Sequence, residues 1–173
     1  MSSSLAHTPA QTPANNVASD WLAAFEAALT SRNLDAAVAL FGAECYWRDL
    51  ISFTWNICTQ ESPDQVRAML AARLDDVAPS NWQLEGDASE AGGITEAWFT
   101  FETRLSRGKG LVRLVNGRAW TLLTTMVELK GHEEKAGFTR PLGAKHGVNP
   151  GAKSWAEERA EEVAKLGYET QPY

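Results

Sequence analysis

Apolar residues recur at helical spacing in three stretches of the first half of the chain. The first stretch covers 17–29, and its apolar positions share one helical face: Val17, Trp21, Ala24, Phe25, Ala28 and Leu29. Asn33 then predicts the N-cap of a short helix that Gly42 closes. Ser62, Pro63 and Gln65 form a capping box with proline at the first helical position, which predicts a third helix with an apolar stripe up to Leu74.

The second half has the pattern of β-strands. "TEAWFTFETRL" (95–105) alternates Trp98, Thr100 and Glu102 with Phe99 and Phe101. In 110–129, Asn116-Gly117 predicts a type I′ hairpin. The strand after this turn is predicted to place Trp120, Leu122, Thr124 and Met126 on one face, against Thr121, Leu123, Thr125 and Val127.

Both faces of 119–129 are largely apolar, so both are expected to be covered, one by the helices and the other by a partner subunit or neighbouring domain. Residues 44–60 are predicted to form a strand, a loop and a short strand, and 81–93 a strand that fades into a loop. "SRGKGLVR" (106–113) is interpreted as a hairpin turn between two strands rather than a phosphate-binding loop.

This order of elements predicts an α+β fold, in which a conical, curved antiparallel sheet wraps around three helices and encloses a pocket. Residues 1–15 are rich in Ser, Thr, Pro and Ala and are predicted to be a disordered arm, followed by the cone over 16–130. Residues 131–173 are predicted to be a linker or strap with a helix at 154–166, which Ser154 and Glu157 open as a capping box. Few positions of that helix are apolar, so we expect it to dock on something larger.

Charge and composition narrow the classes of partner. The net charge of −6 argues against a nucleic-acid backbone and against an anionic membrane surface. No apolar run reaches the roughly 18 residues of a membrane span. The start of the sequence has no signal-peptide pattern, so we expect a reducing cytoplasm in which Cys45 and Cys58 stay unpaired. The histidines have no metal-ligand spacing, and we expect no metal site and no cofactor-binding residue in this chain.

"YWRD" (46–49) is the stretch with the clearest potential for acid–base chemistry. Strand alternation places Trp47 and Asp49 on one face, so Asp49 is a candidate general base in the pocket of the cone. A structural ion pair at the strand end, with Arg113 or Glu102 as the partner, is the more common role for such a cluster. The further candidates for the lining of the pocket are Trp47, Trp55, Trp98, Glu102, Arg113 and Trp120.

The succession of two helices, "ECYWRDL", a Ser-Pro-capped helix and long antiparallel strands resembles the nuclear transport factor 2, SnoaL and ketosteroid isomerase superfamily over about residues 16–130. That resemblance implies the conical α+β fold, which is cystatin-like and SnoaL-like. Its members include enzymes, transport adaptors and binding domains, and they commonly form dimers through the outer face of the sheet, so it does not by itself assign a function.

A narrower resemblance is to the N-terminal domain of bacterial and fungal flavin-containing monooxygenases. It rests on "YWRDLISFTWNICT", "VRLVNGRAWTLLTTMVELKGHEE", "RPLGAKHGVNPGAKSWAEERAEE" and "LGYETQPY". In that family such a domain precedes a flavin module, which opens with a strand and a Gly-x-Gly-x-x-Gly loop that holds the FAD pyrophosphate. The present sequence contains no such loop and no NADPH-binding segment, so FAD and NADPH are implied only for a larger monooxygenase.

Three hypotheses follow. The first is an accessory domain of a flavin-dependent monooxygenase, not catalytic by itself, whose segment 130–173 docks against a flavin module. The second is a small acid–base enzyme of the ketosteroid isomerase or SnoaL type (an isomerase, dehydratase or cyclase) with Asp49 as base and an apolar small molecule as substrate. The third is a module for ligand binding or homodimer formation, with strand 119–129 in the interface.

Overall fold

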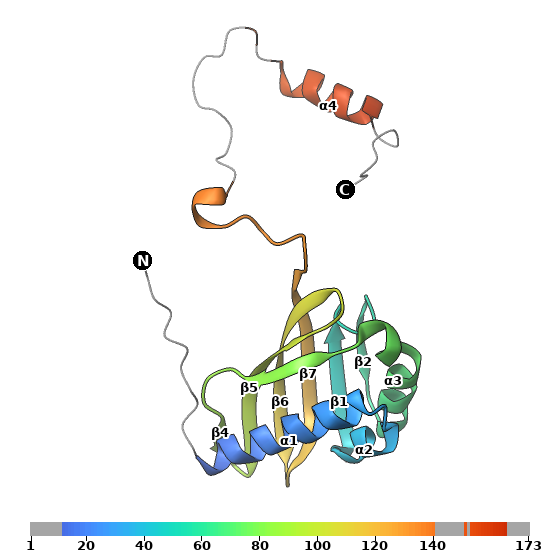
Figure 1. Cartoon of the computed structure of the whole chain (residues 1–173), viewed down its shortest axis with the longest axis vertical. Helices are drawn as coiled ribbons and strands as arrows, with labels where there is room; N and C mark the ends of the chain where they lie inside the picture. The colour runs from blue at the N-terminus through green and yellow to red at the C-terminus, as the bar shows by residue number, and fades with distance from the viewer. Residues whose placement is uncertain (1–11, 141–150, 152, 166–173) are drawn as a thin grey trace. The chain divides into compact units, whose positions relative to one another are not determined.

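The computed structural model describes residues 12–140, 151 and 153–165 of the 173-residue chain. It shows a mixed α+β fold in which a curved sheet of seven strands carries its helices on one face, and this confirms the predicted fold class (Figure 1). The elements of this part are α1 (Pro13–Thr30), α2 (Leu34–Ala39), β1 (Phe41–Leu50), β2 (Ile57–Gln60), α3 (Pro63–Val77), β3 (Ser80–Leu84), β4 (Ser89–Ala91), β5 (Ile94–Glu102), β6 (Ser106–Val115) and β7 (Arg118–Leu129).

Side-chain caps set the starts of the helices. The Ser62 hydroxyl accepts a hydrogen bond from the Gln65 N–H at the start of α3, which confirms the predicted N-cap. The Gln65 side chain accepts one in return from the Glu61 N–H, one residue before the position that a capping box uses. Asn33 caps α2 in the same way. Helix α1 begins at Pro13 behind a Thr12 cap, within the stretch whose composition predicts disorder, because Thr12 and Pro13 supply start signals there. Residues 1–11 of the predicted arm lie outside the described residues.

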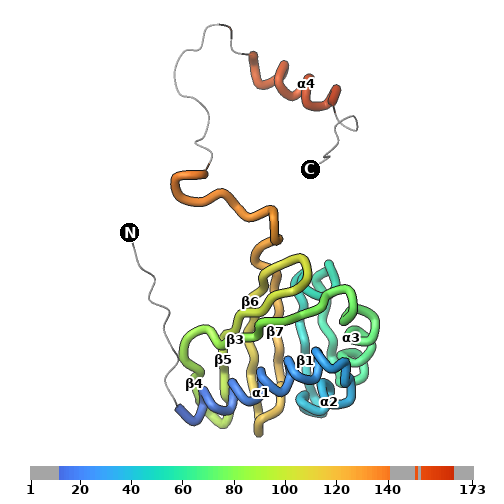
Figure 2. Tube along the Cα trace, viewed as in Figure 1, coloured from blue at the N-terminus to red at the C-terminus, as the bar shows by residue number. Residues whose placement is uncertain are grey.

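The strand order across the sheet is β2-β1-β7-β6-β5-β3, with β4 also paired to β5. All neighbouring pairs are antiparallel except β1 and β7, which run parallel. The central strand β7 thus pairs with β1 from the N-terminal half on one side and with β6 on the other. Asn116 and Gly117 both have positive φ at the β6–β7 turn, which confirms the hairpin. In Figures 1 and 2, α1 crosses in front of the sheet, and it packs against β3 and β5.

The interpretation of "SRGKGLVR" as a turn is wrong, because these residues lie within β6 and the turn precedes them. Gly108 and Gly110 face the core, where the rings of Phe101 and Phe99 on the neighbouring strand lie across β6. A Cβ atom on Gly110 would stand 2.2 Å from the Phe99 ring and 2.4 Å from the Leu123 carbonyl oxygen. The glycines of this run therefore make room for aromatic rings in a strand.

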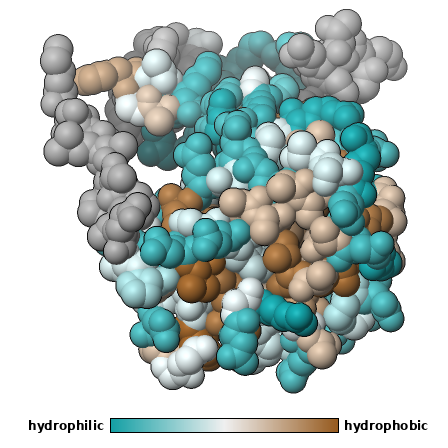
Figure 3. All heavy atoms as spheres, turned by 60° about the horizontal axis from the view of Figure 1, so that its bottom comes forward, coloured by the Kyte–Doolittle hydropathy of each residue, from teal (hydrophilic) through white to brown (hydrophobic). Residues whose placement is uncertain are grey.

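The core between the sheet and the helices is built on eight aromatic rings in mutual contact. Their centroids lie 4.8–6.1 Å apart, in stacked and edge-on arrangements, and they belong to Trp21, Phe25, Phe41, Trp47, Phe53, Trp82, Phe99 and Phe101. The rings occupy the region where the sequence predicts the pocket of the cone. A small depression of about 370 Å³ remains between α1 and β3. On the side of the molecule in Figure 3, apolar patches alternate with polar groups.

Contacts along the chain divide it into two units, Met1–Glu134 and Lys135–Tyr173, whereas the sequence suggests a boundary after residue 130. The described part of the second unit contains the short 3-10 helix η1 (Gly137–Thr139) and α4 (Trp155–Lys165). Ser154 and Glu157 exchange the hydrogen bonds of the predicted capping box. Residues 141–150, 152 and 166–173, which include "LGYETQPY", lie outside the described residues.

We expect Gly110→Ala to destabilise the fold by about 3 kcal/mol, the upper end for overpacking, because the added methyl group collides with a backbone oxygen as well as a ring. Urea denaturation followed by circular dichroism measures this free energy of unfolding. Arg113→Ala on the opposite face of β6 serves as control and should change it by less than about 0.5 kcal/mol. Equal effects of the two substitutions would contradict the packing role of Gly110.

Candidate functional site

Asp49 lies in the core and has no exposed surface. Its Oδ2 atom accepts hydrogen bonds from the backbone N–H groups of Phe53 (3.0 Å) and Thr54 (2.9 Å) and from the Thr54 hydroxyl (2.8 Å). Its Oδ1 atom accepts one from the Thr124 hydroxyl (2.8 Å), which itself accepts one from Trp47 Nε1 (2.9 Å). The partners of Asp49 are backbone amides and hydroxyls, in place of the ion pair that the sequence suggests. The carboxylate is thus compensated by four short hydrogen bonds.

The bonds to Asp49 organise the loop 51–56 between β1 and β2. Ile51 and Trp55 both have left-handed backbone angles, with φ of 59° and 53°. Such angles are strained for large side chains, and each costs on the order of 1–3 kcal/mol. Phe53 is buried in the aromatic core and holds the middle of the loop from inside. The loop therefore has a defined conformation. The hydrogen bonds to Asp49 and the burial of Phe53 offset the strain of its backbone.

The structure separates the residues that the sequence suggests as one site. Trp47 lies next to Asp49 in the core and is fully buried. Trp55 lies on the loop 51–56 and Trp98 on the outer face of the sheet, the face opposite the aromatic core, and both are exposed. Arg113 pairs with Glu96 at 2.6 Å on that same outer face.

Trp120 is exposed while Ala119 and Leu122 are buried, so the predicted alternation that groups Trp120 with Leu122 is wrong. The cause is a register shift in the β6–β7 pairing, where Arg113 pairs with Thr121 but Leu114 pairs with Ala119. This irregularity places an extra residue on β7 and reverses the sidedness of Trp120.

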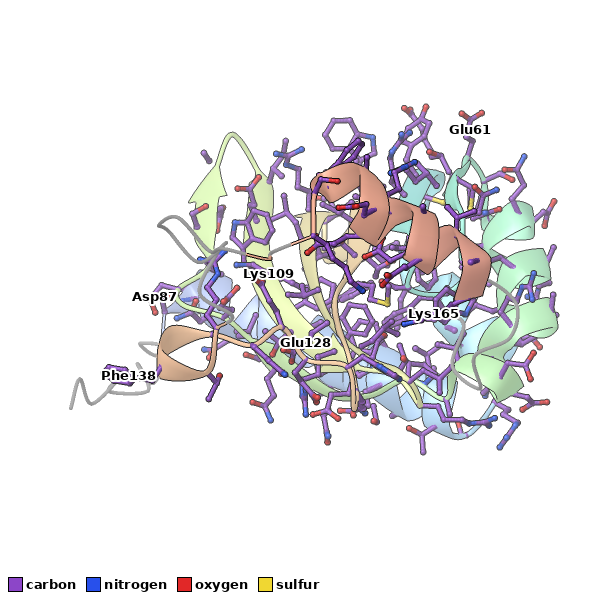
Figure 4. The ribbon with its side chains drawn as sticks, turned by 90° about the horizontal axis from the view of Figure 1, so that it is seen from above. Glu61, Asp87, Lys109, Glu128, Phe138 and Lys165 are labelled. Carbon is purple, nitrogen blue, oxygen red and sulfur yellow. The ribbon has the colours of Figure 1, made fainter. Side chains whose placement is uncertain are left out.

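Glu102 lies in a different place, a depression of about 880 Å³ that we call the outer hollow. The outer hollow is lined by the residue set Asn81, Gln83, Glu85, Thr100, Phe101, Glu102, Arg107, Gly108, Lys109, Met126, Val127, Glu128, Leu129, His132 and Glu134. Those on β3, β5 and β6 stand mostly on the outer face, because they alternate with buried residues of the same strands. In Figure 4, Lys109 and Glu128 lie near each other over this part of the sheet, whereas Glu61 and Asp87 lie at opposite edges.

The charges around the outer hollow are largely paired with one another. Arg107 bridges Glu128 (2.7 Å) and Glu133 (3.0 Å), and Lys109 pairs with Glu85. Lys130 pairs with Glu102 at 2.7 Å, and this hydrogen bond lowers the pKa of Glu102 from its ordinary value. Backbone N–H groups at Gly131 and Glu133, followed by the Arg107 guanidinium, lower the pKa of Glu133 to about 2. The Glu102 and Glu133 carboxylates thus stay ionised at neutral pH.

Arg107, Lys109 and His132 also line this depression, and none of them is among the pocket residues that the sequence predicts. The signal that points to Arg107 and Lys109 is their spacing of two on a strand, which places both on the outer face once 106–115 is assigned as a strand. His132 comes from the turn after β7, and its place in the lining depends on how that turn folds over the sheet end. Such a placement is a tertiary property without a local sequence pattern.

The described residues contain neither a metal-ligand cluster nor a helix suited to cross a membrane. Across 12–140, 151 and 153–165, no three His, Cys, Asp or Glu side chains come together as ligands for a metal ion. Within the same ranges, no helix has both the length and the apolar character that a membrane crossing requires. Cys45 and Cys58 are both free thiols, and burial raises the pKa of Cys45.

No protein-family model matches the sequence, and no curated protein matches it. Solved structures match its fold. A protein described as a candidate polyketide cyclase from Xanthomonas campestris has a TM-score of 0.51 at 10% identity, over 66% of this chain and 93% of that chain. An NTF2-like protein of unknown function from Burkholderia pseudomallei has 0.48 at 16% identity, over 64% and 91%. A protein of unknown function with a cystatin-like fold from Nostoc punctiforme has 0.48 at 16% identity, over 69% and 96%. At these identities the likeness concerns the fold alone.

We expect Thr124→Val to lower the free energy of unfolding by about 1–3 kcal/mol, because it leaves Trp47 Nε1 and one lone pair of Asp49 buried without a partner. Thr125→Val on the other side of the same strand is the matched control and should change it by less than about 0.5 kcal/mol. Chemical denaturation measures both. A cost for Thr124→Val no larger than that of the control would contradict the structural role of the network.

We also expect Arg107→Ala to raise the pKa of Glu133 from about 2 while leaving it below 4.5, since the backbone hydrogen bonds that contribute most remain. Carbon-13 NMR of the side-chain carboxyls measures this titration. Because the folded-state pKa is the lower one, this carboxylate stabilises the fold above pH 4.5 and loses that effect as the pH falls towards 2. A pKa that is unchanged in the variant would contradict the contact with Arg107.

Proposed function

We propose that the chain is a non-catalytic accessory module that acts by association through the outer face of its sheet. On this proposal it is a SnoaL-like domain of the kind that precedes the flavin module in flavin-containing monooxygenases. Its outer face binds the apolar surface of a second copy or of a flavin module. FAD and NADPH would belong to the flavin module, where the oxidation chemistry takes place.

The observation that carries the proposal is a row of apolar side chains across three neighbouring strands. Trp98 on β5 pairs in register with Leu111 on β6, and Leu111 pairs with Leu123 on β7. All three point away from the core, and Trp98 is 43% exposed. The buried core lies on the other face of the sheet, and none of these three residues belongs to it. An exposed apolar row on a sheet is typical of a surface that another protein covers.

The charges beside this row are also suited to association. Arg113 forms an ion pair with Glu96, and Lys109 pairs with Glu85 and lies 4.8 Å from the centre of the Trp98 ring. A partner that covers the row therefore meets pairs of charges instead of isolated ones, which lowers the desolvation cost of the contact.

The surroundings of Asp49 favour this proposal over a small acid–base enzyme. A general base must reach a proton of the substrate at hydrogen-bond distance. The Asp49 carboxylate has no exposed surface, and amide and hydroxyl donors already surround it. Trp47 and Phe53, whose ring centroids lie 4.9 Å apart, pack in the core beside it.

We expect the chain to form dimers in the micromolar range and Leu123→Glu to weaken dimerisation at least about tenfold, because the row would then bury an unpaired charge. Sedimentation equilibrium of the full chain measures the dissociation constant. Leu105→Glu is the matched control, because Leu105 is exposed in the β5–β6 turn outside the row, and it should leave the constant unchanged. A wild-type chain that stays monomeric, or equal effects of both substitutions, would contradict self-association through this face.

A further inference from the structure

The loop 51–56 exposes apolar side chains although its backbone is held in place. Trp55 is 57% exposed and Ile57, directly after the loop, is 61% exposed. The loop is tied to Asp49 through Phe53 and Thr54, as described above. A tryptophan that is fixed in place loses little conformational freedom on binding, and such residues make strong anchors of protein interfaces.

The same region lacks charge. The eleven residues from 50 to 60, "LISFTWNICTQ", contain no Asp, Glu, Lys or Arg, although 22% of the whole chain is charged. β2 is also the outermost strand on its side of the sheet, and edge strands are usually protected by charges. An uncharged edge with an exposed Trp and Ile suits a contact that excludes water.

The loop lies at the same end of the sheet as the outer hollow. β1 runs parallel to β7, and Leu50, the last residue of β1, is in register with Thr125. From Thr125, β7 continues through Met126 and Val127, which line the outer hollow. One end of the sheet thus carries a projecting tryptophan and a depression, separated by the width of a few strands.

Electrostatics favour an uncharged group as the occupant of the outer hollow. Arg107 and Lys109, two cations of its lining, are already paired with carboxylates, so an incoming charge would have to break an ion pair. An indole can lie against these pairs and against the apolar Met126 and Val127 without doing so. Two copies that each carry a net charge of −6 also repel one another, and a contact made by an uncharged side chain adds nothing to that repulsion.

We propose that Trp55 of one copy of the chain enters the outer hollow of a second copy, and that the second copy does the same in return. This inference rests on the self-association in the proposed function and names its anchor. A projection and a depression on one surface satisfy a twofold interface, in which each contact occurs twice. Each buried tryptophan contributes roughly 150–250 Å² of contact, a substantial part of the roughly 800 Å² that each partner buries in a standard interface. The row Trp98, Leu111 and Leu123 supplies further area.

A double-mutant cycle on the full chain tests the proposal. Trp55→Ala removes the projecting ring, and Val127→Glu places a charge in the outer hollow at an exposed position. We expect each substitution to weaken dimerisation by at least about tenfold in sedimentation equilibrium. The double variant should be little weaker than either single variant, because the substituted hollow no longer has a ring to exclude. Added salt should strengthen the wild-type dimer, because it screens the repulsion between two acidic copies.

Trp155→Ala is the matched control, since Trp155 is a more exposed tryptophan on α4 and should leave the dissociation constant unchanged. Circular dichroism of all variants reports whether they remain folded. If Leu123→Glu dissociates the dimer but Trp55→Ala does not, the inference is wrong while the proposed function stands, and the loop 51–56 then serves another partner. Strictly additive effects of Trp55→Ala and Val127→Glu would also overturn it. A monomeric wild-type chain would overturn this inference together with the self-association in the proposed function, and would leave only docking to a flavin module.

Discussion

Much of this structure depends on the hydrogen bonds to the buried carboxylate of Asp49. A charge without access to water is tolerated only when hydrogen bonds compensate it, and here they come from two places far apart in the sequence. The Thr124 hydroxyl connects it to the central strand β7, and the amides of Phe53 and Thr54 connect it to the loop after β1. One side chain thereby fixes the pairing of β1 with β7 and the shape of the loop 51–56. The aromatic core packs around this arrangement through Trp47 and Phe53.

The two faces of the sheet have different roles. On the inner face, rings on neighbouring strands fill the available volume so completely that β6 needs glycine at two positions. On the outer face, apolar residues form a row with paired charges beside it, and Trp98 of this row is exposed. A sheet with a finished core on one side and an apolar row on the other suits a protein that functions in an assembly.

The sequence predicts the elements well wherever local chemistry determines them. Ser62 with Gln65, Asn33 and Ser154 cap helices because a side chain close in sequence satisfies the free N–H groups. Asn116-Gly117 determines its turn because both residues tolerate positive φ. The assembly of the site is predicted less well. The register shift beside Trp120 and the parallel pairing of β1 with β7 arise from tertiary packing. Alternation correctly places Trp47 and Asp49 on one face but does not show that rings cover that face.

The position of β7 between β1 and β6 affects how the chain folds while the ribosome synthesises it. β7 is the last strand of the sheet to be synthesised, yet it lies in the middle of it, between β1 and β6. While residues 13–115 emerge, β1 and β6 each lack a neighbour, and the Asp49 carboxylate lacks its Thr124 donor. Nascent chains in this state expose strand edges and apolar rings, which is the condition that chaperones recognise. The core is therefore expected to close in one late step, once Leu129 has left the exit tunnel.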